Sequence, residues 1–547
     1  MEKIRDTENG WSMSFDHVSG LPAYVDVYDT TLRDGAQQEG ISLTVEDKLR
    51  VARQLDSMGF RFIEGGWPGA NPKDAEFFRR APAELKLENA TLVAFGSTRR
   101  AGAKTESDPT LRALLEASTG SVCLVAKAWD YHVTDALRTT LDEGVKMAFD
   151  SVSFLVREGL QVFFDAEHFF DGYKRNPMYS LAVLDAAEQA GARTIVLCDT
   201  NGGALPYEVE EIVSNVKEVC STQVGVHFHN DSGCAVANSL TAVRSGATHV
   251  QGCINGYGER TGNANLSTVV PDLTLKMGIE TVPREKIQLI SSISRHVAEI
   301  VNLPLSSQSP YVGSSAFTHK AGLHVSAIAR RPDAYEHVDP ETVGNGTRFV
   351  VSEMAGRQSL LLKANELGVE IREDSLSQVL ERLKELEHKG YHFEVADGSL
   401  ELLLRRSEGW RQEFFTLESF KVLTEYKEGG ESVTEATVKL IIDQARVIET
   451  AEGNGPVSAL DAALRKALRP HFNSLDGLHL TDFKVRVLDS NKAIDATVRV
   501  LIDSANGDDS WSTIGVSSNV IEASWHALVD SLVVGLLRAA LGSVRGG

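Results

Sequence analysis

One pattern recurs eight times between Val25 and Gly278. A short β-branched or aromatic run is followed by a turn rich in Gly, Asp or Asn, and then by an amphipathic helical stretch. The apolar runs are VDVYDTTL, RFIEGG, TLVAFGS, SVCLVAKA, QVFFDAE, TIVLCDT, QVGVHFH and HVQGCIN. Strands that alternate with helices indicate a parallel sheet. Eight such units match a (β/α)8 barrel, and a doubly wound open sheet is the structural alternative.

The helix expected after the first strand carries start and stop signals. Thr44 is a good N-cap, Glu46 and Asp47 suit the positive end of a helix, and Gly59 ends it. An apolar stripe runs along it, formed by Leu49, Ala52, Leu55 and Met58.

Three further parts are expected around the barrel. We predict an N-terminal tail over residues 1–20, the barrel over 21–282, a linker subdomain of helices and loops over 283–409, and a C-terminal α+β domain over 410–547. The last part contains a repeat, because LESFKVLTEYKEGGESVTEATVKLIID aligns with LTDFKVRVLDSNKAIDATVRVLID. Each copy reads strand, strand, strand, helix, which indicates a duplicated βββα unit.

The charge balance excludes some partners. The net charge is -21 and the pI is about 5.2, so nucleic acid and anionic lipid would repel the chain. The five cysteines are an odd number at scattered positions without C-x-x-C, which fits a reducing cytoplasm better than disulfides or metal clusters. The N-terminus lacks an apolar signal region, and no apolar run approaches the roughly 20 residues of a membrane span. We therefore expect a soluble cytoplasmic protein.

Polar residues gather at four of the predicted strand ends, where barrels of this type carry their catalytic groups. They are Arg33 and Asp34 after the first strand, Glu167 after the fifth, His227 and His229 on the seventh, and Asn263 in a Gly-rich turn after the eighth. Residues two apart on a strand face the same side, so the two histidines project together. Because strands seven, eight and one are contiguous in a closed barrel, Asp34, Asn263 and the two histidines can form a mixed N/O site for a divalent cation.

Three segments carry a family resemblance. DTTLRDGAQQEG, HFHND and NGYGERTGNANL resemble signatures of the family of 2-isopropylmalate, homocitrate and citramalate synthases. The barrel and metal site are also similar to those of HMG-CoA lyase, but the resemblance to the synthases covers essentially the whole chain, including FTHKAGLHVSAI, YEHVDPETVG and the duplicated domain. IEGGWPGANPKDAEFF and FFDAEHFFDGYKRNP most resemble the long-chain citramalate synthases. One departure is Asp165-Ala166-Glu167, where isopropylmalate synthases usually have Ser-Pro-Glu or Ser-Glu-Asp.

The resemblance implies a reaction and a set of site residues. Acetyl-CoA would condense with pyruvate and water to give (R)-citramalate and CoA, the first step of a pyruvate route to isoleucine. One divalent cation (Mg, Mn or Zn) would polarise the oxo acid. Its implied ligands are Asp34, His227, His229 and Asn263. Arg33 would neutralise charge on the keto or enolate oxygen, Glu167 would orient substrate or relay a proton, and Thr200 would contact the oxo acid's carboxylate.

The resemblance also places a base in the linker. His324 would deprotonate the methyl group of acetyl-CoA with Tyr335 as its partner, and His319 is a weaker candidate. Without the resemblance, His324 would be read as a surface histidine.

The duplicated domain has two interpretations, one regulatory and one purely structural. The helix N-termini near Gly453, Gly455 and Ser517 could hold the carboxylate of a small zwitterion, and the resemblance suggests isoleucine as that effector. The domain would also contribute to a homodimer. In the structural alternative, the domain only stabilises the protein.

Other functions stay open at this point. A sister synthase would use 2-oxoisovalerate or 2-oxoglutarate, a lyase would cleave a carbon–carbon bond, and a barrel without activity would serve as a branched-chain amino-acid sensor. We expect the bulky aromatic residues of the fifth unit to crowd one strand mouth, which suits a small oxo acid. These residues are Phe163, Phe164, Phe169 and Phe170.

Overall fold

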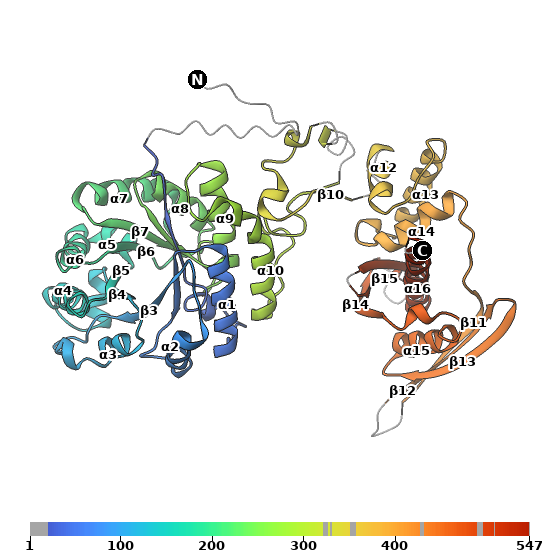
Figure 1. Ribbon diagram of the computed structural model, residues 1–547, viewed down its shortest axis with the longest axis horizontal. Coiled ribbons are helices and arrows are strands. Elements are labelled where there is room, and N and C mark those ends of the chain that lie inside the picture. The colour runs from blue at the N-terminus through green and yellow to red at the C-terminus, as the bar shows by residue number, and fades with distance from the viewer. Residues whose placement is uncertain are drawn as a thin grey trace. The chain divides into compact units, whose positions relative to one another are not determined.

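The computed structural model describes residues 20–320, 327–328, 331–350, 357–426, 432–488, 496–507 and 509–545. The chain forms two compact units (Figure 1). The first runs to Phe317 and includes residues 336–347. The second consists of residues 318–335 and the chain from Arg348 onward.

The first unit is a closed barrel of eight parallel strands in chain order (Figure 1). The strands are β1 (Asp26–Asp29), β2 (Phe62–Gly66), β3 (Thr91–Ser97), β4 (Ser121–Lys127), β5 (Gln161–Glu167), β6 (Thr194–Asp199), β7 (Gln223–Phe228) and β8 (His249–Gly252). The barrel closes because β1 pairs with β8 as well as with β2, with Asp26 opposite His249. This closure confirms the predicted (β/α)8 barrel and removes the open-sheet alternative.

Helices surround the barrel and bury its outer face. They are α1 (Val45–Met58), α2 (Pro72–Glu84), α3 (Pro109–Glu116), α4 (Leu141–Arg157), α5 (Phe169–Arg175), α6 (Pro177–Gln189), α7 (Pro206–Val219), α8 (Ala235–Arg244), α9 (Leu266–Pro271) and α10 (Ile290–Val301). The signals read for α1 are present: Thr44 and Asp47 form a capping box, and Gly59 ends the helix at φ 90°. The apolar stripe of α1 is fully buried in the core between strands and helices.

The barrel interior differs between its two ends. At the amino end of the strands, Tyr28, Phe62, Phe163 and His249 stack into a buried aromatic layer. At the carboxyl end, charged side chains gather among apolar ones around a cavity. The site therefore lies where this fold places catalytic groups.

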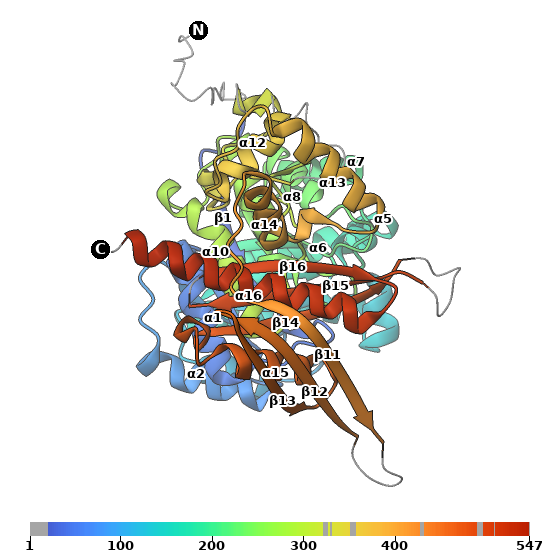
Figure 2. The same ribbon diagram turned by 90° about the vertical axis from the view of Figure 1, so that its right-hand side faces the viewer.

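The second unit contains the duplicated domain. Its sheets are antiparallel: β11 (Thr416–Glu425), β12 (Val433–Ile442) and β13 (Ala445–Gly453) form one, and β14 (Leu478–Val487), β15 (Val498–Asn506) and β16 (Asp509–Ser517) the other. The first sheet packs on α15 (Pro456–Leu468) and the second on α16 (Val520–Arg545), as Figure 2 shows. The predicted βββα repeat is confirmed.

Residues of the predicted linker fall in both units. They include α12 (Arg357–Glu366), α13 (Leu376–His388), α14 (Asp397–Ser407) and a two-stranded sheet of β9 (Thr318–His319) and β10 (Arg348–Phe349). The domain boundaries given above stay predictions.

One helix corrects the expectation about apolar runs. Within α16, Val520–Leu541 is long and apolar enough to cross a membrane by length and composition alone, and 67% of that window is buried inside the protein. Because Leu528, Leu532 and Val534 belong to the core of the duplicated domain, α16 is a core helix.

Candidate metal centre and substrate cavity

Asp34 is held in a tight turn after β1. Thr30 accepts at its carbonyl oxygen from the backbone N–H groups of Asp34 and Gly35, and Asp29 fixes Thr31 through both carboxylate oxygens. A single 3-10 turn, Gly35–Gln37, then starts next to Asp34. The Asp34 side chain is buried and lines the cavity at this end of the barrel.

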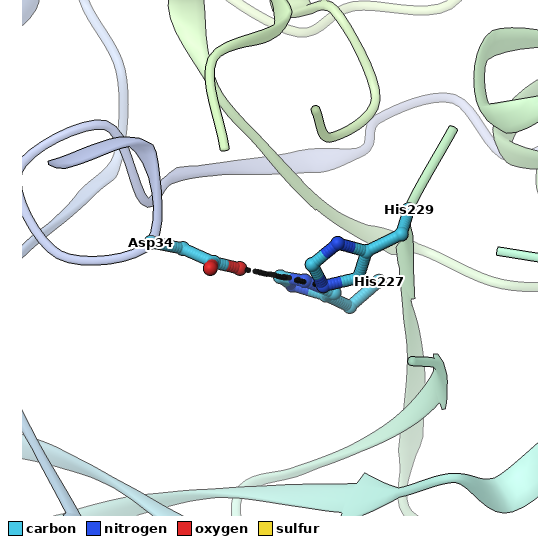
Figure 3. A group of neighbouring side chains, drawn as sticks. All are labelled: Asp34, His227 and His229. Carbon is cyan, nitrogen blue, oxygen red and sulfur yellow. Dashed lines mark ion pairs between the residues drawn. The ribbon is translucent and has the colours of Figure 1, made fainter. Parts of the chain in front are cut away.

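The two histidines reach Asp34 from β7 (Figure 3). The Nε2 atom of His227 lies 3.1 Å from Asp34 Oδ2, and the Nε2 atom of His229 lies 3.7 Å from the same oxygen. His229 stands one residue past the end of β7, where it bridges to Asn263. The structure therefore brings together the turn after β1 and the H-x-H pair.

Asn263 completes this group of polar atoms. Its amide nitrogen donates to the carbonyl oxygen of Tyr257 at 3.1 Å, and its Oδ1 is buried without a hydrogen-bond partner among the described residues. Gly258 makes room for the amide: with φ at 148°, a Cβ there would stand 2.2 Å from the Asn263 nitrogen. The Gly-rich turn thus holds an amide with its oxygen unpaired.

These donors fit a divalent cation. One ligand atom each from Asp34, His227 and His229 lie within 4.8 Å of one another, and all three residues are buried. Two imidazole nitrogens, a carboxylate and an orphaned amide oxygen form a mixed N/O set, which suits a divalent ion with open positions. A buried polar atom without a partner is costly, so a ligand for Asn263 Oδ1 is expected.

Local charges keep Asp34 ionised. Burial opposes the charged form, but Arg33 and the two histidines outweigh it and hold the pKa of Asp34 well below its usual range. Burial also disfavours charge on both imidazoles. The Asp34 carboxylate nevertheless raises the pKa of His227, whereas burial and the neighbouring His227 lower the pKa of His229 to about 4.

Arg33 is fixed from three sides. Its Nε donates to Glu64 Oε1 at 2.5 Å, its Nη1 lies 3.5 Å from Asp34, and its guanidinium stacks 3.9 Å from the centre of the Phe95 ring. Glu64 in turn accepts from the Tyr28 hydroxyl at 2.6 Å. The guanidinium is therefore oriented beside the proposed ion without free rotation.

A cavity of about 660 Å³ opens over this group. Its lining includes Arg33, Asp34, Glu167, Thr200, His227 and His229. Glu167 forms an ion pair with Lys127, which also lines the cavity. The Thr200 hydroxyl accepts from the backbone N–H of His168 at 2.9 Å. Six residues selected from the sequence thus share one cavity.

The sequence analysis did not assign a role to three polar side chains at this end. Glu64 orients Arg33, while Gln251 and Asp165 form a hydrogen-bonded chain to His227. Burial and the nearby Glu64 raise the pKa of Asp165 to about 6. A signal was available, because each is a polar residue within a strand that reads as buried.

Other predicted residues lie elsewhere. His324 lies outside the described residues, and Tyr335 belongs to the second unit, where it is half exposed. The suggestion that aromatic residues crowd the fifth strand's mouth is wrong. All four are buried and none lines the cavity: Phe163 stacks on His249 at the amino end, and Phe164, Phe169 and Phe170 pack in the outer core.

The fold and site define a class, the HMGL-like barrels. The HMGL-like family model matches residues 24–297, the homocitrate synthase post-HMGL domain-like model matches 311–391, and the LeuA allosteric (dimerisation) domain model matches 394–535. Within that class, the chain belongs to the (R)-citramalate synthase family. It is 53% identical to the (R)-citramalate synthase of Streptomyces coelicolor over 94% of this chain and 97% of that protein.

One further relative covers most of the chain, and one solved structure covers about half of it. Identity is 50% with the (R)-citramalate synthase of Aquifex aeolicus, over 94% of this chain and 98% of that protein. The crystal structure of HMG-CoA lyase from Bacillus subtilis aligns with 52% of this chain and 96% of that chain, at 23% identity and a TM-score of 0.45.

Proposed function

We propose that this chain condenses acetyl-CoA with pyruvate and water to give (R)-citramalate and CoA, as the first step of a cytoplasmic route to isoleucine. The observation that carries the proposal is the group formed by Asp34, His227 and His229 beside Arg33 at the base of the cavity. A 2-oxo acid presents a carboxylate and a keto oxygen side by side, and such a pair suits a cation flanked by a guanidinium.

Asp34, His227, His229 and Asn263 would hold one divalent cation (Mg, Mn or Zn). When bound, the ion supplies Lewis acidity to the keto group of the oxo acid. The unpaired Oδ1 of Asn263 supports its inclusion in the set. Fixed ligands in a dry site reduce the reorganisation needed as charge develops.

The other cavity residues would act on the oxo acid and on protons. Arg33 neutralises the charge that develops on the keto oxygen, because Glu64 and Phe95 hold its guanidinium in place. Thr200 contacts the substrate carboxylate, since it lines the cavity. Glu167, which pairs with Lys127, orients substrate or water, or relays a proton.

Carbon–carbon bond formation also needs a base for acetyl-CoA. We assign it to His324 with Tyr335 as its partner, on the family resemblance of AGLHVSA and YEHVDPETVG. The base removes a proton from the acetyl methyl group, the resulting carbon attacks the keto carbon, and hydrolysis of the thioester releases CoA. A His324→Ala variant should keep pyruvate binding and lose turnover, and an equal loss of both would indicate a structural role.

Release of free thiol from acetyl-CoA tests the reaction across a panel of 2-oxo acids. We expect pyruvate to give the highest kcat/KM. Preference for 2-oxoisovalerate or 2-oxoglutarate would make the chain a sister synthase, and no thiol release with any of them would contradict an enzymatic role.

The duplicated domain would bind isoleucine and contribute to a homodimer, and its two copies differ at the proposed effector site. Gly455 precedes α15 without a side-chain cap. The second copy caps itself, because Asn519 accepts from the N–H of Ile521 at 2.8 Å and the Ser517 hydroxyl donates to Glu522. The first copy, with Gly453 and Gly455, therefore has N–H groups left for a carboxylate.

Substitution at Gly455 tests this site. A Cβ at Gly455 meets nothing within 4 Å, so the fold should tolerate Gly455→Leu. The larger side chain should block the helix N-terminus and relieve inhibition by isoleucine with little loss of turnover. The control is Gly203→Ala in the barrel, whose Cβ also meets open space. If isoleucine inhibits the Gly455→Leu enzyme as strongly as the parent, the effector site does not lie at this helix end.

A further inference from the structure

We propose that Gln251 and Asp165 form a positioning relay that fixes which nitrogen of His227 faces the metal site, and that the relay thereby sets metal affinity. The inference deepens the proposed function, since it rests on His227 as a ligand. Gln251 contacts His227 at the ring nitrogen that faces away from the proposed ion, and Asp165 contacts Gln251. Both residues therefore act through His227.

The relay crosses the barrel interior. Gln251 of β8 lies opposite His227 of β7 in the strand register, and its Oε1 stands 2.9 Å from His227 Nδ1. Its Nε2 donates to Asp165 Oδ1 on β5 at 3.0 Å. All three side chains are buried, although Asp165 and His227 also line the cavity, and burial strengthens these hydrogen bonds.

The chemistry of the three groups fixes the direction of each bond. An ionised carboxylate only accepts hydrogen bonds, so Asp165 must meet the NH2 face of the Gln251 amide. The amide oxygen then faces His227, and Nδ1 must carry the imidazole proton. The Nε2 atom is then left to face Asp34 Oδ2, 3.1 Å away, where a metal ion would replace the proton that this pair shares.

The reverse orientation is costly. A flipped Gln251 would set its carbonyl oxygen against the Asp165 carboxylate with no proton between them. Two buried acceptors would then lose a partner, and each such loss costs about 1–3 kcal/mol. The relay therefore holds a single tautomer of His227, as partners of metal-binding histidines do when they fix ring orientation.

The neighbouring histidine supplies an internal contrast. The Nδ1 atom of His229 is buried and has no hydrogen-bond partner among the described residues. Its ring is therefore not fixed by a second residue in the way that His227 is. The two ligands should respond differently when the relay is cut.

The same barrel also offers a matched control at its amino end. There Gln223 donates to the Asp26 carboxylate at 3.1 Å, so an amide again pairs with a carboxylate. Gln223 starts β7 and has no contact with His227 or His229 through that pair. Gln223→Leu removes buried amide hydrogen bonds to Asp26, Thr194 and Thr248 without touching the metal site.

Two readouts on the full-length protein test the relay. The ring nitrogen shifts of His227 in metal-free protein, assigned by their loss in His227→Ala, report the tautomer. Competition with a chelator for Mn²⁺ or Zn²⁺ reports affinity. We expect Gln251→Leu to mix the two tautomers and to weaken metal binding about 10–100-fold. Gln223→Leu should leave both readouts unchanged.

A swapped pair supplies the rescue. In Asp165→Asn the amide of residue 165 can donate or accept, so Gln251 loses its fixed orientation and affinity falls. In Asp165→Asn/Gln251→Glu the asparagine donates to the new carboxylate, which again accepts from His227 Nδ1, so tautomer and affinity should return. A retained tautomer and unchanged affinity in Gln251→Leu overturn the relay. If the parent binds no divalent metal, the proposed function fails, while the tautomer readout still judges the relay.

Discussion

The two ends of the barrel interior hold buried histidines in opposite chemical settings. At the amino end, His249 stacks on Phe163 with ring centres 5.4 Å apart, and both of its ring nitrogens are buried without partners among the described residues. Burial lowers its pKa to about 3. At the carboxyl end, His227 is buried as deeply but faces Asp34 and Gln251, and its pKa is raised.

The difference separates burial from function. Burial alone keeps an imidazole neutral and lets it pack like an aromatic ring. A carboxylate on one nitrogen and an oriented amide on the other give His227 the arrangement of a metal ligand. Only the second setting opens onto the cavity.

The largest expected effect is the loss of a ligand at the carboxyl end. We expect His227→Ala and Asp34→Ala each to lower kcat by about 10³-fold or more, because each leaves the ion with an incomplete donor set. Thiol release measures the loss, and circular dichroism should show a folded barrel. His249→Leu is the control, with activity within a few-fold of the parent. Equal losses of kcat in His227→Ala and His249→Leu would contradict the difference between the two ends of the barrel.

An intermediate effect is expected at Gly258. Gly258→Ala places a Cβ against the Asn263 amide at a φ of 148°, so the amide must move and metal affinity should fall about 10-fold or more. Gly233→Ala is the matched control, because it carries a positive φ of 74° with open space around the Cβ. Similar metal affinity in both variants would show that Asn263 is not a ligand.

The smallest effect concerns stability at the amino end. Because the pKa of His249 falls from 6.5 in the unfolded chain to about 3 when folded, the unfolded state binds more protons between these values. Stability should therefore fall as pH drops from 6.5 towards 3, by at most about 1.4 kcal/mol per pH unit from this group.

His249→Leu removes that contribution. At pH 7.5 the variant should lose about 1–3 kcal/mol through imperfect packing in the aromatic layer, and the gap to the parent should narrow on acidification. Urea unfolding at pH 7.5, 6 and 5 measures it. A gap that stays constant over this range would mean that His249 is protonated in the folded barrel.

The sequence predicted the fold through its repeated local signals. Eight apolar runs with turns gave the strands, and the capping residues of α1 gave a helix boundary, because both depend on neighbours in the chain. The βββα repeat was found from its own alignment. Phe163 was misplaced because alternation along a strand does not reveal which end of the barrel a side chain fills, whereas Phe164, Phe169 and Phe170 pack in the outer core.

Part of the candidate site was equally accessible. Asp34, His227 and His229 stood at strand ends in a recognisable pattern, so their convergence followed from barrel closure. Glu64, Gln251 and Asp165 act through contacts between strands that are distant in the chain, which spacing alone does not encode. Their polar character within buried strands is visible in the sequence, but their partners appear only in the structure.

The most direct test of the metal-centred account is thiol release by exhaustively demetallated full-length protein, before and after titration with a divalent cation. We predict that acetyl-CoA and pyruvate give no thiol above background after demetallation, and that activity returns with one equivalent of Mg²⁺, Mn²⁺ or Zn²⁺ bound per chain. His227→Ala should not recover under the same titration. Full activity in the demetallated protein would contradict the account.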